Sequence, residues 1–208
     1  MALTDINDAD RPPLIYLARH GQTEFNVARR YQGQGDSPLT ARGEQQARRM
    51  GERLADLIED PTGWRLCASP LGRARRTAEI IAEALRGQLA PETDPRLAEV
   101  SMGAWDGLTF EEVEARRPRH VVHCERHFHG PGGETFEALC ARLSDWLAEV
   151  GAKGRVVAVS HGVSGRVLRG LYGGLPRERM LRLEAPQDAI HRLEAGLVRR
   201  ISCEPVEA

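Results

Sequence analysis

Three short apolar runs, each followed by a turn and a helical pattern, constrain the fold of this chain most. The runs cover residues 14–18, 64–68 and 156–159, and their apolar, partly β-branched or aromatic composition predicts buried strands. Because strands that alternate with helices usually pair in parallel, the pattern predicts an open α/β sheet that is mostly parallel. Sites in such sheets lie beyond the carboxyl ends of the strands.

Histidines and arginines occur at these predicted strand ends. The first strand ends in Arg19-His20-Gly21, the last in Ser160-His161-Gly162, and Arg73 begins the helix after the middle strand. A cation is unfavourable at a helix N-terminus unless an anion is bound there. Arginine forks suit phosphate, and histidine can attack or accept a proton near neutral pH. Arg-His-Gly alone fits a surface turn equally well, but the second histidine at a strand end favours a phosphoryl site.

Smaller signals surround the first histidine motif. Gly21 permits a tight turn, and Thr23 is a candidate N-cap whose helix start would present N–H groups to an anion. Glu99 lies between apolar neighbours. It is either a hydrogen-bonded structural group or an acid with a raised pKa that donates a proton to a leaving group and then activates water. The sequence leaves both interpretations open.

Composition limits the other functional classes. The chain has 208 residues, a net charge of −1, 41% hydrophobic and 28% charged residues, as expected for a soluble globular protein. Nothing in this balance supports binding of nucleic acid or of a membrane surface. The four cysteines form no Cys-x-x-Cys pair, which favours free thiols in a reducing cytoplasm. Residues 1–13 lack a long apolar run, so we expect a flexible tail rather than a signal peptide, and a single domain from residue 14 to residue 208.

The segment from residue 108 to residue 131 is the least regular part of the predicted domain. It holds His120, His123, His127 and His129, and in a helix His120, Cys124 and His127 would share one face. That arrangement suggests a metal site, although a variable segment over the active site is the favoured interpretation. Further on, short apolar runs between residues 180 and 201 predict edge strands, in which His191 is structural.

The motifs together resemble the histidine phosphatase superfamily, in its phosphoglycerate-mutase-like branch, over about residues 14–171. They comprise Leu17-Ala18-Arg19-His20-Gly21-Gln22-Thr23 with Asn26, Gln32-Gly33 with Asp36 and Pro38-Leu39-Thr40, Ser69-Pro70-Leu71 with Arg73, Ala74 and Thr77, Glu99 with Gly103, Trp105 and Gly107, Pro131-Gly132-Gly133-Glu134, and Ser160-His161-Gly162. The resemblance implies a three-layer α/β/α sandwich around a mostly parallel sheet.

The resemblance also implies roles for particular residues. His20 is the implied nucleophile that forms phosphohistidine, and Glu99 is the implied proton donor. The implied phosphate pocket consists of Arg19, Arg73 and His161. Further substrate or phosphate contacts are implied for Gln22, Thr23, Asn26, Gln32, Gly33 and Gly162. No metal and no other cofactor are implied for phosphatase chemistry.

Departures from the mutase pattern favour net hydrolysis of a small phosphorylated metabolite. Met102 and Val163 stand where mutases of this type usually carry Tyr and Asn, and the middle segment looks shorter than the mutase insertion. Arg116, Arg117 and Arg119 keep a second anion site, and therefore a cofactor-dependent phosphoglycerate mutase, open as the alternative. A non-catalytic phosphate-binding scaffold is a further alternative. A sugar phosphate, phosphoglycerate, nucleotide or cobalamin-precursor ester all remain open as substrates, as does the oligomeric state, a dimer included.

Overall fold

A six-stranded sheet forms the centre of the computed structural model, which describes residues 13–204 except the side chains of 152 and 153. The strand order is β3-β2-β4-β1-β5-β6. The strands are β1 (Leu14–Arg19), β2 (Trp64–Ala68), β3 (Pro91–Thr93), β4 (Arg155–Ser160), β5 (Ala189–Glu194) and β6 (Leu197–Ser202). β1, β2, β3 and β4 run parallel, whereas β5 is antiparallel to both β1 and β6. The predicted mostly parallel α/β sheet is therefore confirmed.

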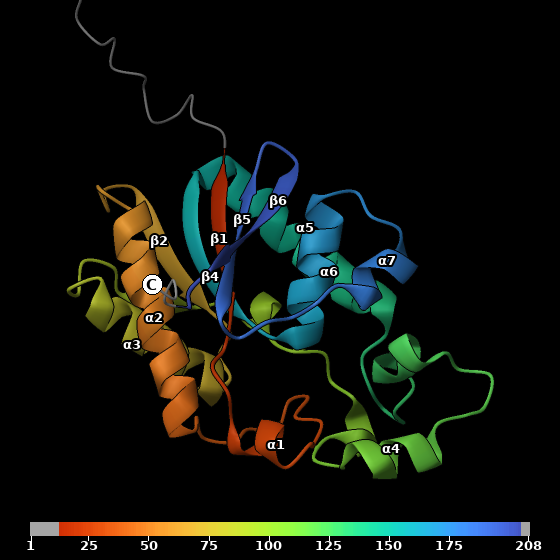
Figure 1. Cartoon of the computed structure of the whole chain (residues 1–208). Coiled ribbons are helices and arrows are strands. Elements are labelled where there is room, and N and C mark those ends of the chain that lie inside the picture. Colours follow the sequence, from red (N-terminus) through yellow and green to blue (C-terminus); the bar gives the residue numbers. More distant parts are fainter. Residues whose placement is uncertain (1–12, 205–208) are drawn as a thin grey trace, which may run out of the picture.

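Helices cover both faces of the sheet (Figure 1). α2 (Ala41–Leu57) and α3 (Gly72–Ala84) lie on one face, and α5 (Phe136–Lys153) and α6 (Gly162–Tyr172) lie on the other. This three-layer arrangement follows from the period of two along a strand, which sends successive side chains to opposite faces.

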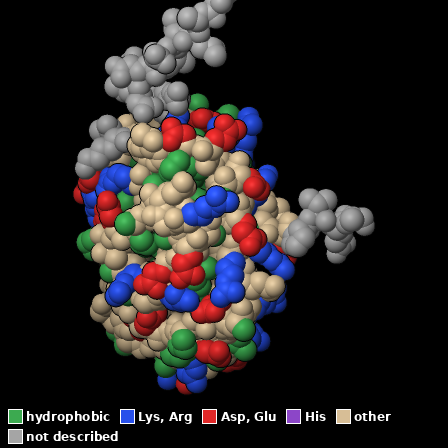
Figure 2. Space-filling view, turned by 90° about the vertical axis from the view of Figure 1, so that its left-hand side faces the viewer, with side chains coloured by type: hydrophobic (Ala, Val, Ile, Leu, Met, Phe, Trp, Pro, Cys, Tyr) green, Lys and Arg blue, Asp and Glu red, His purple; other side chains and the backbone are tan. Residues whose placement is uncertain are grey.

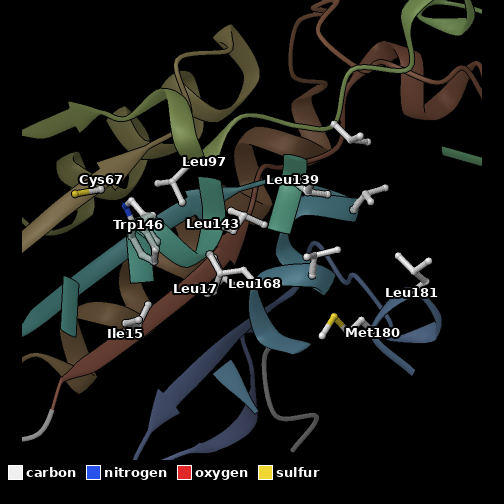
Figure 3. Close-up of a cluster of buried hydrophobic side chains, with 14 of the residues drawn as sticks. Ile15, Leu17, Cys67, Leu97, Leu139, Leu143, Trp146, Leu168, Met180 and Leu181 are labelled. Carbon is white, nitrogen blue, oxygen red and sulfur yellow. The ribbon is translucent and has the colours of Figure 1, made fainter. Parts of the chain in front are cut away.

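The two cores show this alternation directly. Ile15 and Leu17 of β1 pack into the core beneath α5 and α6, next to Trp146 (Figure 3). Tyr16 and Ala18 of the same strand pack into the core beneath α2 and α3. Fully burying a large apolar side chain contributes about 1.5–3 kcal/mol. The apolar runs are continuous, rather than alternating, because each strand is buried on both faces.

The connections place a crevice at the carboxyl ends of β1 and β4. These strands are neighbours, but the chain leaves β1 through α1 (Glu24–Val27) towards α2 on one face and leaves β4 for α6 on the other. Such a point, at which neighbouring connections diverge, opens the crevice in which α/β proteins bind ligands.

The segment between the third strand and α5 contains only short elements. They are η2 (Pro95–Leu97), η3 (Gly103–Trp105), α4 (Phe110–Arg116) and η4 (His123–Phe128), and a further short helix, α7 (Arg177–Arg182), follows α6. α4 and the loops around it extend below the sheet in Figure 1, on the side where β1 leads into α1. Residues 108–131 thus contain one short helix and one 3₁₀ segment, which agrees with the irregular segment predicted there.

Two expectations about strands were wrong, and one strand was not predicted. β3 carries no signal in the sequence, because this three-residue strand is exposed throughout and has no apolar pattern. Leu181 lies in α7 rather than in a strand. β5 is an interior strand that pairs with β1 and β6, so of the two strands predicted in this region only β6 lies at an edge. The predicted tail, residues 1–13, lies outside the described residues apart from Pro13.

The surface carries charges of both signs. On the side of α2 and α3, acidic and basic side chains alternate without a large patch of one sign (Figure 2). Within the described part of the chain, no helix has the length and apolar character to cross a membrane. The four cysteines are free thiols, as predicted.

Candidate active site

β1 delivers His20 to the crevice in a defined orientation. The backbone N–H of His20 donates to the Ser160 carbonyl at 3.0 Å and so continues the pairing of β1 with β4. The ring Nδ1 lies 2.8 Å from the Gly21 carbonyl. Since a carbonyl only accepts, Nδ1 carries the hydrogen and Nε2 keeps its lone pair. Burial, with the nearby Arg19 and Arg73 guanidinium groups, lowers the pKa of His20 well below its usual value. His20 is therefore a neutral base with a free nucleophilic nitrogen.

His161 directly follows β4, and its ring lies next to that of His20. The two ring centroids are 5.1 Å apart. His161 Nε2 lies 2.7 Å from the Ser69 hydroxyl, which follows β2, and its buried Nδ1 has no hydrogen-bond partner. Burial also lowers the pKa of His161, as do Arg73 and His20. The ends of β1, β2 and β4 thus hold the two rings in place.

Two arginines bring fixed positive charge to the same crevice. Arg19 donates through Nη1 to the Ala185 carbonyl at 2.6 Å, and burial lowers its pKa to about 10. Arg73 is 2% exposed and donates through Nη2 to the Gly33 carbonyl at 2.9 Å, while its Nη1 lies 3.3 Å from Asp36. The Nε atoms of both arginines are buried without a partner. Each guanidinium therefore retains a donor for an anion, which a buried polar group needs.

Glu99 caps helix α6. Its Oε1 accepts hydrogen bonds from the backbone N–H groups of Val100 and Ser164 and from the Ser164 hydroxyl, at 3.1, 2.9 and 3.1 Å. Its Oε2 accepts from the Val163 N–H at 3.1 Å. These bonds satisfy N–H groups that every helix start leaves unpaired. Oε2 accepts fewer bonds and so has spare lone-pair capacity for a proton or a water.

These side chains surround a cavity of about 290 Å³. Eight of the predicted site residues line it: Arg19, His20, Asn26, Gln32, Gly33, Arg73, Glu99 and Gly162. Five arginines line it as well, namely Arg19, Arg30, Arg73, Arg126 and Arg166, against the single carboxylate of Glu99. This volume is at the lower end of ligand pockets, which suits a small anionic ligand.

Three predicted residues do not line this cavity. The Gln22 side chain accepts a hydrogen bond from the Thr40 hydroxyl at 3.0 Å. Thr23 is fully buried and forms a capping box with Asn26 at the start of α1, as its predicted N-cap role requires. His161 lies behind His20 and borders a smaller adjoining cavity with Arg19. Gln22 and Thr23 are thus supports of the loop rather than parts of the cavity wall.

The cavity wall also contains residues outside the predicted phosphate site, although the sequence singled out His127 as a possible metal ligand. They include Tyr31, Arg126, His127 and Arg166. Arg166 lies four residues after Gly162 on α6, so a helical projection that places both on one face could have put it near the site. Arg126 and His127 belong to η4, whose position depends on tertiary contacts. The sequence places His127 in a variable segment over the active site, but no local pattern points to Arg126.

Another unpredicted residue, Gln187, lies just before β5. Its amide Nε2 donates to the His20 carbonyl at 3.1 Å and to Asn26 Oδ1 at 3.0 Å. This side chain therefore ties the loop after β1 to the segment that precedes β5.

The expectations for residues 108–131 need correction in two respects. Arg116 donates to the Glu112 carbonyl at 3.0 Å and Arg117 pairs with Glu114, and neither of these arginines nor Arg119 lines the cavity. The helix face that would join His120, Cys124 and His127 does not form, because the chain there is a 3₁₀ segment that starts at residue 123. Among the described residues, no group of three or more His, Cys, Asp or Glu side chains is arranged to hold a metal ion.

Comparison with known proteins gives consistent results. The sequence profile of the histidine phosphatase superfamily (branch 1) matches residues 15–198. A probable phosphoglycerate mutase, GpmB, from Salmonella paratyphi C is 42% identical over 179 residues, which are 81% of this chain and 80% of that protein.

Two solved structures share the fold. A mycobacterial glucosyl-3-phosphoglycerate phosphatase has a TM-score of 0.73 and 27% identity, and the match covers 91% of this chain and 97% of that one. The α-ribazole phosphatase from Shigella flexneri has a TM-score of 0.72 and 26% identity, over 91% of this chain and 95% of that one. The family profile matches residues 15–198, which include nearly the whole described sheet. This chain therefore belongs to the histidine phosphatase superfamily.

Proposed function

We propose that this protein is a metal-independent phosphatase that hydrolyses small phosphomonoesters through a phosphohistidine on His20. One observation carries the proposal. His20 Nε2 has a free lone pair in a cavity where Arg19 and Arg73 each retain an unpaired buried N–H, with the unpartnered Nδ1 of His161 behind it. A nucleophile surrounded by fixed donors is the arrangement that phosphoryl transfer needs.

In the first half-reaction, His20 Nε2 attacks phosphorus and the bond from phosphorus to the ester oxygen breaks. Arg19, Arg73 and His161 bind the phosphoryl oxygens and stabilise the charge that develops on them. Glu99 donates a proton to the departing oxygen. The spare capacity of Oε2 assigns the transfer to that atom, which lies on the Gly162 side of the cavity together with the Arg19 guanidinium.

In the second half-reaction, Glu99 accepts a proton from water as the water attacks the phosphohistidine. The nitrogen–phosphorus bond breaks, inorganic phosphate leaves and His20 regains its lone pair. The apolar side chains of Met102 and Val163, which also line the cavity, support transfer to water rather than firm retention of a second phosphorylated molecule. The partner in this reaction is a small phosphorylated metabolite, and the free thiols favour a cytoplasmic location.

A phosphoglycerate mutase is the second candidate, since a relative with 42% identity is a probable mutase. A mutase would interconvert 3-phosphoglycerate and 2-phosphoglycerate, with stimulation by a bisphosphoglycerate. Phosphate release without this interconversion would exclude it.

A panel of phosphorylated metabolites, assayed for phosphate release, tests the proposal. We expect turnover that persists after exhaustive chelation and falls by at least about a thousandfold in His20→Ala, because removal of a nucleophile eliminates the covalent route. Full activity in His20→Ala would contradict the proposal. The absence of phosphate release from every substrate, together with phosphate binding, would support the scaffold alternative.

A further inference from the structure

Two buried polar atoms in the cavity wall have no role in the proposed reaction. Arg166 Nε and His127 Nδ1 are both buried without a hydrogen-bond partner, as are the corresponding atoms of Arg19, Arg73 and His161. The last three are accounted for by the transferred phosphoryl group. Since buried polar groups are nearly always hydrogen-bonded, the first two indicate a ligand group that is separate from that phosphoryl.

The charges around these two atoms favour an anion. Arg126 also lines the cavity, with its guanidinium carbon 5.5 Å from the centre of the Tyr31 ring. In the described part of the chain, no carboxylate lies within ion-pair distance of Arg126 or Arg166. Burial lowers the pKa of Arg166, the nearby Glu99 carboxylate raises it, and Arg126 lowers it further, because the two guanidinium groups repel each other.

His127 lies in the field of both arginines. Burial, followed by Arg126 and Arg166, lowers its pKa to about 3, so it is neutral and can donate one N–H without adding charge. Arg126 donates to the Tyr31 hydroxyl and to the His123 carbonyl, but its positive charge has no carboxylate partner among the described residues. Two arginines without such a partner and a neutral donor form an anion site, and a bound anion relieves the repulsion between the arginines.

We infer that Arg126, His127 and Arg166 form a subsite for a second anionic group of the substrate. The substrate class is then phosphomonoesters that carry a further acid group, either a carboxylate or a second phosphoryl group, within reach of the same small cavity. The inference rests on the proposed function for the position of the first phosphoryl group. It assigns substrate choice to residues of η4 and α6 rather than to Arg116, Arg117 and Arg119.

Non-hydrolysable ligands test the subsite without relying on turnover. Propylphosphonate and 3-phosphonopropionate have similar length and differ in a methyl against a carboxylate, and propane-1,3-bisphosphonate supplies a second phosphoryl-like group. We expect the full chain to bind at least one of the doubly acidic ligands at least about tenfold more tightly than propylphosphonate. A charge-assisted hydrogen bond to the second acid group contributes binding free energy of this size. The doubly acidic ligand that binds more tightly identifies the second acid group as a carboxylate or a phosphoryl group.

Variants locate the effect. Arg166→Gln and, separately, Arg126→Gln should remove most of this preference while leaving the affinity for propylphosphonate within about threefold. Arg116→Gln is the matched control and should retain the preference, because Arg116 lies outside the cavity. If Arg166→Gln fails to fold, Arg126→Gln decides the result.

The outcomes separate the two proposals. Equal affinity of the unmodified protein for all three ligands, or an equal loss for all three in the variants, would overturn the subsite. Selective binding together with absence of phosphate release would support the subsite and contradict the phosphatase. Loss of the preference in Arg116→Gln alone would transfer the subsite to the other arginine cluster.

Discussion

His20 shows how burial and neighbouring positive charge prepare a side chain for its proposed reaction. Its neighbours Arg19 and Arg73, which would bind the phosphoryl group in the proposed reaction, add to burial in keeping the ring neutral. A solvent-exposed histidine with an ordinary pKa would be partly protonated at mildly acidic pH and unable to attack. The Gly21 carbonyl orients the His20 ring by accepting the hydrogen bond from Nδ1.

The acidic limb of the pH profile should therefore lie well below pH 6.5. The folded-state pKa of His20 is lowered, so His20 stays neutral as pH falls through the usual histidine value and loses its lone pair only at lower pH. The measurement is kcat/KM against pH for two substrates whose phosphate pKa values differ, which distinguishes substrate ionisation from that of the enzyme. A loss of activity centred near pH 6.5 for both substrates would contradict a neutral buried nucleophile.

At the scale of elements, the start of α6 joins structure to chemistry. His161 precedes the helix without capping it, and Glu99 supplies the cap from a distant segment. The same carboxylate that would exchange protons with substrate thus also fixes the helix that carries Arg166.

Glu99→Ala should reduce both stability and activity. Loss of a helix cap costs about 1 kcal/mol of unfolding free energy, and loss of the proton donor should lower kcat by about a hundredfold or more. Chemical denaturation and steady-state kinetics measure the two effects. Ser164→Ala is the control, because it removes the hydroxyl that contacts the Ala98 carbonyl and Glu99 but leaves the backbone donors to Glu99 in place. Unchanged stability in Glu99→Ala would show that the cap contributes nothing.

The loop after β1 depends on close backbone contact with α2. A Cβ at Gly43 would lie 2.0 Å from the Gln22 carbonyl oxygen, so Gly43→Ala must displace the loop that carries His20. We expect a large loss of kcat/KM together with destabilisation of about 1–3 kcal/mol. Gly151→Ala is the matched helical control, since nothing lies within 4 Å of its Cβ. It should be neutral or stabilising by up to about 1 kcal/mol. Equal behaviour of the two variants would contradict the contact.

Prediction from the sequence succeeded where a local pattern determines structure. The strands β1, β2 and β4 are buried on both faces, so each shows a continuous apolar run, and their order with the helices predicts the parallel pairing. β3 gives no such signal, because it is held at the sheet edge by backbone pairing with β2. The sequence places the segment of Arg126 and His127 over the active site. Its individual side chains could not be assigned to the cavity wall, because packing on Tyr31 rather than a local pattern positions them.

At the scale of the whole molecule, four buried histidines link folding to pH. The pKa is lowered to about 3 for His127 and His191 and well below the usual value for His20 and His161, with burial as the largest cause in each. Below pH 6.5 the unfolded chain binds more protons than the folded chain. The contribution of these histidines to the unfolding free energy is therefore fully present above pH 6.5 and decreases as pH falls. Arg169 also lowers the pKa of His191, and its Nη1 donates a hydrogen bond to His191 Nε2 at 2.8 Å.

Unfolding free energy should therefore decrease by up to about 1.4 kcal/mol per histidine for each pH unit below 6.5. Urea denaturation at about pH 7.5 and about pH 5.5, in buffers without phosphate, measures the difference, since most carboxylates are ionised at both values. His120→Gln, at an exposed position, should leave the difference unchanged. Equal stability at the two pH values would show that the buried histidines are protonated without cost.

The proposed mechanism requires a covalent phosphoryl group on His20. Phosphohistidine is stable in base and labile in acid, so the enzyme is mixed with a substrate from the panel, quenched in alkali within one turnover, digested and analysed by mass spectrometry. The account predicts one phosphoryl group on the peptide that contains His20, its loss on acid treatment and its absence in His20→Ala. Turnover without any phosphorylated peptide, or a phosphoryl group on His161 instead, would contradict it.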